Sequence, residues 1–270
     1  MVTMLCPVRD CRESLARHDR RLACSRGHSF DVARRGYVNL LQPQDRRSPH
    51  PGDSPAAVTA RARLRDQGTE REFVERIAAL VPAAPADAVL DVGCGDGAHV
   101  AAVAARSGCE GHGLDISVAA IEAAARRHPA LHWVVGNADR FIPYADRSFA
   151  TVLSITARLN AAEFRRVLRD GGTLVVVVPA PDDLIELRAA VLAEGVVRPR
   201  TARVIEACTP LFTVTREEQL RGRAVLDADA VADVLASTYR AFRWSERARA
   251  ETVGPLDVTL ARDVLVFRPR

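Results

Sequence analysis

From about residue 58 onward, short apolar runs alternate with segments in which apolar and polar positions recur at helical spacing. The apolar runs predict strands within AVLDVG (88–93), CEGHGLDIS (109–117), LHWVVGNA (131–138), FATVLSIT (149–156) and TLVVVVPA (173–180). The periodic segments predict helices over 55–81 with a break at Gly68, over 97–107, over 118–128, and over 160–170 with an end at Gly171 and Gly172. Strands that alternate with helices build a parallel sheet covered on both faces. We therefore expect a doubly wound, mostly parallel α/β fold.

The two ends of the chain depart from this alternation. A strand within 207–227, a helix near 231–238 and the strand VTLARDVLVF follow the fifth run, and we place the last strand at the edge of the sheet, antiparallel to its neighbour. Residues 42–57 are rich in Pro, Ser and charge, as exposed loops are. We predict an N-terminal module over 1–41, a linker over 42–57 and an α/β domain over 58–270.

Composition favours a globular protein, since 48% of the 270 residues are hydrophobic and 27% are charged. No apolar run reaches the roughly 18 residues that span a bilayer, and MVTMLCPVRD lacks the apolar core of a secretory signal. We expect a cytoplasmic protein without a membrane partner. Residues 1–66 carry 13 arginines against seven acidic residues. This excess favours an anionic partner such as nucleic acid, although a solvated arginine surface explains it equally well.

Half of the six cysteines lie in the N-terminal module, where Cys6, Cys11, Cys24 and His28 follow the spacing C-x4-C-x12-C-x3-H. Zinc takes four such ligands from two tight turns, so we predict a zinc-ribbon module. The alternative is a set of small buried residues without a metal. Cys94, Cys109 and Cys208 are scattered and are best explained by packing.

The stretch VLDVGCGDGAHV (89–100) places a glycine loop directly after the first strand. A dinucleotide loop has the spacing G-x-G-x-x-G, whereas here Gly97 comes one residue early after Gly93 and Gly95. Asp91 would repel a diphosphate and attract a sulfonium or an ammonium group. A nucleotide-binding domain for another cofactor remains the alternative.

Two further polar positions complete this pattern. Asp115 ends the second strand, where a carboxylate can accept both ribose hydroxyls, and Asn137 follows the third, where its carbonyl can accept from an adenine amino group. The order resembles class I S-adenosylmethionine (SAM) dependent methyltransferases. That resemblance implies SAM as the cofactor, contacted by Asp91, Gly93, Gly95, Gly97, His99, Asp115, Ile116, Asn137 and Ala138.

Longer strings narrow the resemblance. CSRGHSFDVARRGYVNLL (24–41), PGDS (51–54) and PAPDDLIEL (179–187) strongly resemble the 23S rRNA guanine-N1 methyltransferase family, which includes housekeeping and macrolide-resistance enzymes. The resemblance implies that the zinc module grips a 23S rRNA hairpin and that N1 of a loop guanine is methylated.

The chain departs from that family at two places. Thr69 and Glu70 replace the usual H-Y after Gly68, and Arg158 replaces the proline of an A-P pair after Ala157. Two alternatives stay open: a relative that methylates a small molecule in natural-product biosynthesis, and a SAM-binding relative that binds RNA or the ribosome without turnover. A closed apolar pocket beside Arg158 and Pro179 would indicate the former.

No general base is evident from the sequence. Asp139, Asp183 and Glu186 are carboxylates that could approach the pocket, although each is better explained as structural or solvated. The sequence leaves the oligomeric state open, a homodimer included.

Overall fold

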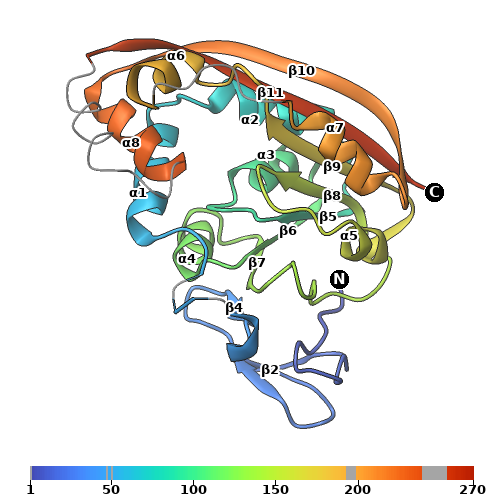
Figure 1. Cartoon of the computed structure of the whole chain (residues 1–270). Helices are drawn as coiled ribbons and strands as arrows, with labels where there is room; N and C mark the ends of the chain where they lie inside the picture. The colour runs from blue at the N-terminus through green and yellow to red at the C-terminus, as the bar shows by residue number, and fades with distance from the viewer. Residues whose placement is uncertain (1, 47, 50, 193–198, 239–253) are drawn as a thin grey trace.

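The computed structural model describes residues 2–46, 48–49, 51–192, 199–238 and 254–270, and its centre is one eight-stranded sheet (Figure 1). The strand order is β10-β11-β9-β8-β5-β6-β7-β4. The strands are β4 (Val38–Asn39), β5 (Ala88–Val92), β6 (Glu110–Asp115), β7 (His132–Val135), β8 (Phe149–Ile155), β9 (Leu168–Pro179), β10 (Phe212–Leu226) and β11 (Leu256–Pro269). Strands β4 to β9 pair in parallel, while β11 pairs antiparallel with both β9 and β10. The predicted mostly parallel sheet is confirmed.

Helices cover both faces of the sheet, and strand β9 shows why. Val175 and Val177 lie in one apolar cluster with residues of α2 and α3, whereas Val176 and Val178 lie in a second cluster with residues of α5 and α7. A strand buried on both faces needs no polar alternation, which explains its unbroken valines. The helices are α1 (Pro55–Asp66), α2 (Arg71–Leu80), α3 (Ala98–Ser107), α4 (Val118–Arg127), α5 (Ala161–Val167), α6 (Ile185–Leu187), α7 (Thr201–Cys208) and α8 (Ala228–Thr238).

The first two helices begin and end where local chemistry dictates. The Ser54 hydroxyl caps α1 by accepting from the Ala57 N–H, and Pro55 occupies the first turn, where its missing N–H costs nothing. Gly68 separates α1 from α2 with a φ of +81°, so the predicted break is confirmed. Among the helices of the described ranges, none is both long and apolar enough to cross a bilayer.

Two predicted boundaries were wrong, namely the end of the helix expected over 160–170 and the start of the strand expected over 173–180. The helix ends at Val167 and β9 begins at Leu168, so Gly171 lies inside the strand. Phe149 pairs with Leu168 but Thr151 pairs with Thr173, so the intervening residues of β9 bulge, and Gly171 supplies the positive φ of the bulge.

The C-terminal strand is antiparallel, as predicted, but it does not lie at the edge. Strand β11 is enclosed by β9 and β10, and β10 is the edge strand. The two strands pair along nearly their full length, and the solvent-facing side chains of β10 include several charged residues, which suit an exposed edge.

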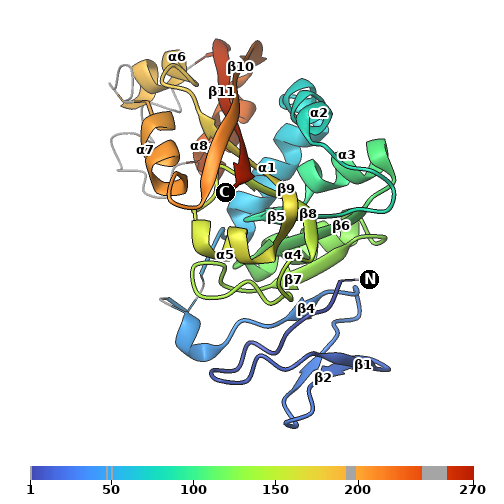
Figure 2. The same cartoon turned by 90° about the vertical axis from the view of Figure 1, so that its right-hand side faces the viewer.

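The N-terminal module contains a three-stranded antiparallel sheet of β1 (Ala16–His18), β2 (Arg21–Ala23) and β3 (Ser29–Asp31). Figure 2 shows it beside β4 and β7. Strand β4 extends the large sheet at its β7 edge, and Met4 forms a bridge with Tyr144. An ion pair between Arg35 and Glu122 of α4 adds a further contact between the module and the α/β body. The division at residue 41 stays a prediction.

We predict that Gly97→Ala destabilises the protein far more than Gly171→Ala. Both residues have a positive φ, which costs an alanine about 1 kcal/mol. A Cβ on Gly97 would also fall 2.1 Å from Cη2 of buried Trp133, whereas a Cβ on Gly171 would meet no atom within 4 Å. We expect a loss of about 2–4 kcal/mol for the first variant in denaturant unfolding. Equal losses would show that Trp133 does not confine the loop.

Candidate functional site

A cavity of about 780 Å³ lies at the carboxyl ends of β5, β6, β7 and β8, between the sheet and helices α1 and α8. Ligands of open α/β sheets bind at this end of the strands. Eight of the nine residues predicted to contact the cofactor line the cavity, namely Asp91, Gly93, Gly95, His99, Asp115, Ile116, Asn137 and Ala138. The ninth, Gly97, lies against the ring of Trp133 instead, so a glycine is needed there for packing and not for contact with the cavity.

The glycine loop is fastened to the end of strand β6. The Gly93 N–H donates to the Leu114 carbonyl (2.7 Å), and the Gly95 N–H donates to Oδ2 of Asp115 (2.9 Å). The other Asp115 oxygen accepts from the Ser117 N–H (2.8 Å). A Cβ on Gly93 would lie 2.5 Å from Cβ of Ala157, so only glycine fits there. The loop thereby leaves the space above it open.

Asp91 lies beneath this loop and is only 1% exposed. Among the described residues, none donates a hydrogen bond of normal geometry to either of its carboxylate oxygens. Burial and the nearby charge of Asp115 raise the pKa of Asp91 to about 7. A buried, unpaired carboxylate is unfavourable, and a ligand bearing an ammonium or sulfonium group would compensate it. The residues present therefore fit SAM.

Arginines complete the wall, and the sequence analysis missed them. Arg65 forms a two-pronged ion pair with buried Asp96 (2.8 and 2.9 Å), and Arg61 pairs with Asp53 of the PGDS segment (2.7 Å). The Arg65–Asp96 pair joins α1 to the glycine loop 31 residues away, whereas the Arg61–Asp53 pair joins α1 to the turn directly before it. Sequence spacing carries no signal for a contact such as Arg65–Asp96.

The opposite side of the cavity contains Glu70, at the start of α2, which the sequence analysis named only as a departure from the family and not as a site residue. Its Oε1 accepts from Nη2 of Arg262 (3.1 Å), and its side chain is 37% exposed towards the cavity. Burial alone would raise the pKa of Glu70, but the positive charge of Arg262 lowers it below its ordinary value. Glu70 is therefore ionised at neutral pH.

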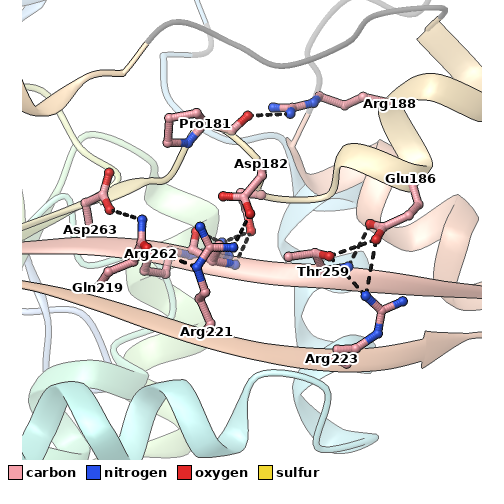
Figure 3. Close-up of polar contacts among 12 residues, drawn as sticks. Pro181, Asp182, Glu186, Arg188, Gln219, Arg221, Arg223, Thr259, Arg262 and Asp263 are labelled. Carbon is pink, nitrogen blue, oxygen red and sulfur yellow. Dashed lines mark hydrogen bonds and ion pairs between the residues drawn. The ribbon is translucent and has the colours of Figure 1, made fainter.

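The three carboxylates considered as bases lie in different surroundings. Asp183 lines the cavity, but it is nearly buried and accepts from the Ala261 N–H and from Arg262. Glu186 does not line the cavity; it binds Thr259 and Arg223 and holds the PAPDDLIEL segment against β11 and β10 (Figure 3). Asp139 lines the cavity and pairs with exposed Arg158 (3.2 Å).

His99 lies in the first turn of α3 and lines the cavity. Burial lowers the pKa of its imidazole to about 4, so the ring is neutral at physiological pH. Its Nδ1 has no hydrogen-bond partner among the described residues. The structure thus leaves one ring nitrogen available to a bound molecule.

The predicted zinc ligands converge in the N-terminal module. Donor atoms of Cys6, Cys11, Cys24 and His28 all lie within 4.8 Å of one another. The Cys11–Cys24 sulfur distance is 3.8 Å, and Nδ1 of His28 is 3.5 and 3.4 Å from the sulfurs of Cys6 and Cys24. A tetrahedral zinc site with ordinary bond lengths has sulfur–sulfur and sulfur–nitrogen edges of about 3.8 and 3.6 Å. The four residues fit a structural zinc ion.

We predict that Asp91→Asn stabilises the ligand-free protein at neutral and higher pH. The folded-state pKa of about 7 exceeds the ordinary value of 3.8, so the folded protein binds the Asp91 proton more tightly than the unfolded chain. Stability from this group is therefore full below about pH 4 and declines as pH rises towards 7. The variant removes that decline and gains on the order of 2–4 kcal/mol at pH 8. Denaturant unfolding from pH 4 to 8 measures this, with exposed Asp146→Asn as the control; parallel curves for wild type and Asp91→Asn would contradict it.

We predict that Cys24→Ser releases the zinc of this cluster and unfolds the N-terminal module, because a three-ligand site lacks the closed tetrahedron. Elemental analysis and limited proteolysis within residues 1–41 report the two effects. Cys109→Ala removes a buried thiol outside the cluster and should change neither. Retention of this zinc by the serine variant would disprove the ligand assignment.

Comparisons with known proteins agree with this geometry. A zinc-ribbon family model described as "RlmA, N-terminal" matches residues 4–49, and the model "Methyltransferase domain" matches residues 89–172. A solved structure from Bacillus halodurans C-125, provisionally named a methyltransferase, is 15% identical and superimposes with a TM-score of 0.51 over 72% of this chain and 97% of that one. This likeness shows the fold alone, which is that of the SAM-binding methyltransferases.

Two curated relatives match nearly the full chain. The 23S rRNA (guanine(748)-N(1))-methyltransferase of Streptomyces fradiae is 39% identical over 98% of this chain and 96% of its own length. A Micromonospora griseorubida protein, provisionally named a 23S rRNA (guanine-N(1)-)-methyltransferase, is 33% identical over 98% and 96%. This chain, a zinc ribbon followed by a methyltransferase domain, belongs to the 23S rRNA guanine-N1 methyltransferase family.

Proposed function

We propose that the protein is a SAM-dependent methyltransferase that acts on N1 of a guanine in a 23S rRNA hairpin. The observation that carries the proposal is the unpaired, buried carboxylate of Asp91 beneath a glycine loop, facing a cavity with a second carboxylate, Asp115. The full-length relatives supply the acceptor. When bound, SAM provides an activated methyl group.

Each cofactor-side residue has a role in this proposal. Asp91 would lie near the cationic part of SAM, and Asp115 has lone pairs left for the ribose hydroxyls after accepting from Gly95 and Ser117. Asn137 donates to the Asp45 carbonyl and accepts from the Asp139 N–H, so one lone pair of its carbonyl oxygen stays for the adenine amino group. His99 and Ile116 would complete the wall.

The N-terminal module would bind the RNA. The described arginines of residues 2–46 are all solvent-exposed: Arg9, Arg12, Arg17, Arg20, Arg21, Arg26, Arg34, Arg35 and Arg46. Exposed guanidinium groups bind phosphates in two-pronged fashion. An RNA substrate also fits the predicted cytoplasmic location.

The acceptor end of the cavity favours RNA over an apolar small molecule. Arg158 is 77% exposed at the cavity, and Glu70 and Arg262 add charge there. A closed apolar pocket beside Arg158 and Pro179, the expectation for a small-molecule enzyme, is not what these residues form.

Glu70 is the carboxylate best suited to the guanine edge. N1 of neutral guanine carries a proton that must leave when the new N–C bond forms, and its neighbour N2 donates two further hydrogens. Asp183 is nearly buried and holds a backbone N–H, whereas no hydrogen bond joins the second oxygen of Glu70 to another described residue. In this proposal Glu70 orients the guanine and accepts the N1 proton.

The decisive test is incubation with radiolabelled SAM and either deproteinised 23S rRNA or a small-molecule extract. We expect label in the RNA and 1-methylguanosine in its nuclease digest. Label confined to the extract would overturn the RNA assignment, and binding of SAM without label in either would indicate a non-catalytic relative.

We predict that Asp115→Ala weakens SAM binding by about 1–3 kcal/mol, because charged hydrogen bonds to the ribose and to the glycine loop are lost. Calorimetric titration measures the affinity. Asp146→Asn, at an exposed site away from the cavity, serves as the control. Unchanged affinity in Asp115→Ala would refute the ribose role.

We predict that Glu70→Gln lowers kcat on rRNA about 100-fold or more and leaves SAM affinity unchanged, because the amide keeps the shape but loses the proton acceptor. Glu72→Gln on the exposed face of α2 is the matched control and should keep full activity. Equal activity of Glu70→Gln and Glu72→Gln would remove Glu70 from the reaction.

A further inference from the structure

A second group of metal-ligand side chains lies at the opposite end of the sheet from the cavity. Glu110 and His112 lie on β6, and His132 lies directly beside His112 on β7, where the two residues are register partners. Strand β6 begins at Glu110 and delivers Asp115 to the cavity at its other end. These three residues form a group separate from the cofactor pocket and from the zinc ribbon, which we call the His–Glu cluster.

The ligand atoms of the His–Glu cluster converge. Oε1 of Glu110 is 3.1 Å from Nε2 of His112 and 3.3 Å from Nε2 of His132, and all three atoms lie within 4.8 Å of one another. The edges of a tetrahedral zinc site with nitrogen and oxygen ligands are about 3.3 Å. The two imidazole rings stack with their centroids 4.5 Å apart, and the Nε2 atom of each ring lies beside the same Glu110 oxygen. The side chain of His132 is 43% exposed, so its ring is not fixed by packing on every side.

The surroundings of His112 suit a metal ligand. Its Nδ1 lies 3.2 Å from the hydroxyl of buried Tyr144, the kind of outer contact that fixes the orientation of a ligating imidazole. The partial exposure of Glu110 and His132 leaves room for water as a fourth ligand.

We propose that Glu110, His112 and His132 form a second divalent-metal site, with Zn²⁺ as the expected ion. Two imidazoles and one carboxylate with an open position are an established ligand set for zinc and neighbouring first-row metals. The site joins β6 to β7 close to Tyr144, which pairs with Met4 of the N-terminal segment. A bound ion would fasten this junction.

The test counts metal on the full-length protein. After equilibration with excess Zn²⁺ and gel filtration, elemental analysis should find two zinc ions per wild-type chain and one in His132→Gln and Glu110→Gln. Cys24→Ser should lose the other ion and keep this one. His18→Gln, an exposed histidine outside both clusters, should keep two.

Spectra and affinities separate the two sites further. Co²⁺ added to protein that already holds one zinc should give visible absorption without the thiolate charge-transfer bands of a cysteine site. Tyr144→Phe should weaken binding at the His–Glu cluster about tenfold in a chelator competition. One zinc per wild-type chain would mean a purely hydrogen-bonded cluster and would overturn the proposal. A second zinc that survives both His132→Gln and Glu110→Gln would do the same.

Discussion

The buried carboxylate of Asp91 is the constraint around which the cavity is arranged. Asp91 lies near the end of β5, beneath the glycine loop, where its carboxylate is buried close to Asp115. Burial and the charge of Asp115 raise the pKa of Asp91 to about 7. Such a group lowers the stability of the ligand-free protein, and a cationic ligand such as the SAM proposed above would compensate it. Gly93 and Gly95 have no side chains to fill the space above the loop, so the proposed cofactor could approach Asp91. The same carboxylate would therefore lower the stability of the ligand-free protein and raise the affinity for a cationic cofactor.

Local patterns made part of this arrangement predictable. The valines of β9, the glycine loop and the ribbon ligands are recognisable from short sequence patterns. Each lies where its pattern indicated, except that Gly97 packs against Trp133 and does not line the cavity. Local patterns also misled. Gly171 looked like a helix end, but its positive φ serves a bulge in β9, because pairing with β8 outweighs helix continuation.

Contacts between distant residues were not predictable. Glu70 meets Arg262 across 192 residues, and Arg65 meets Asp96 across 31. Neither pair has a spacing that periodicity or motif reading could detect. The same holds for the strand order at the C-terminal edge, which depends on β10 pairing with β11 over its whole length. The acceptor end of the cavity is built largely from such contacts, so its chemistry emerged only from the fold.

The junction between the two parts of the chain has a thermodynamic consequence. Strand β4 follows the ribbon directly and hydrogen-bonds to β7, with the Leu40 N–H donating to the Val135 carbonyl (2.8 Å). The next residues along the chain, Gly136 and Asn137, line the cofactor cavity, and Asn137 is further tied to the Asp45 carbonyl. If zinc orders the N-terminal part, these contacts would transmit that order to one wall of the cavity. By linkage, zinc and SAM would then each raise the affinity of the protein for the other by the same factor.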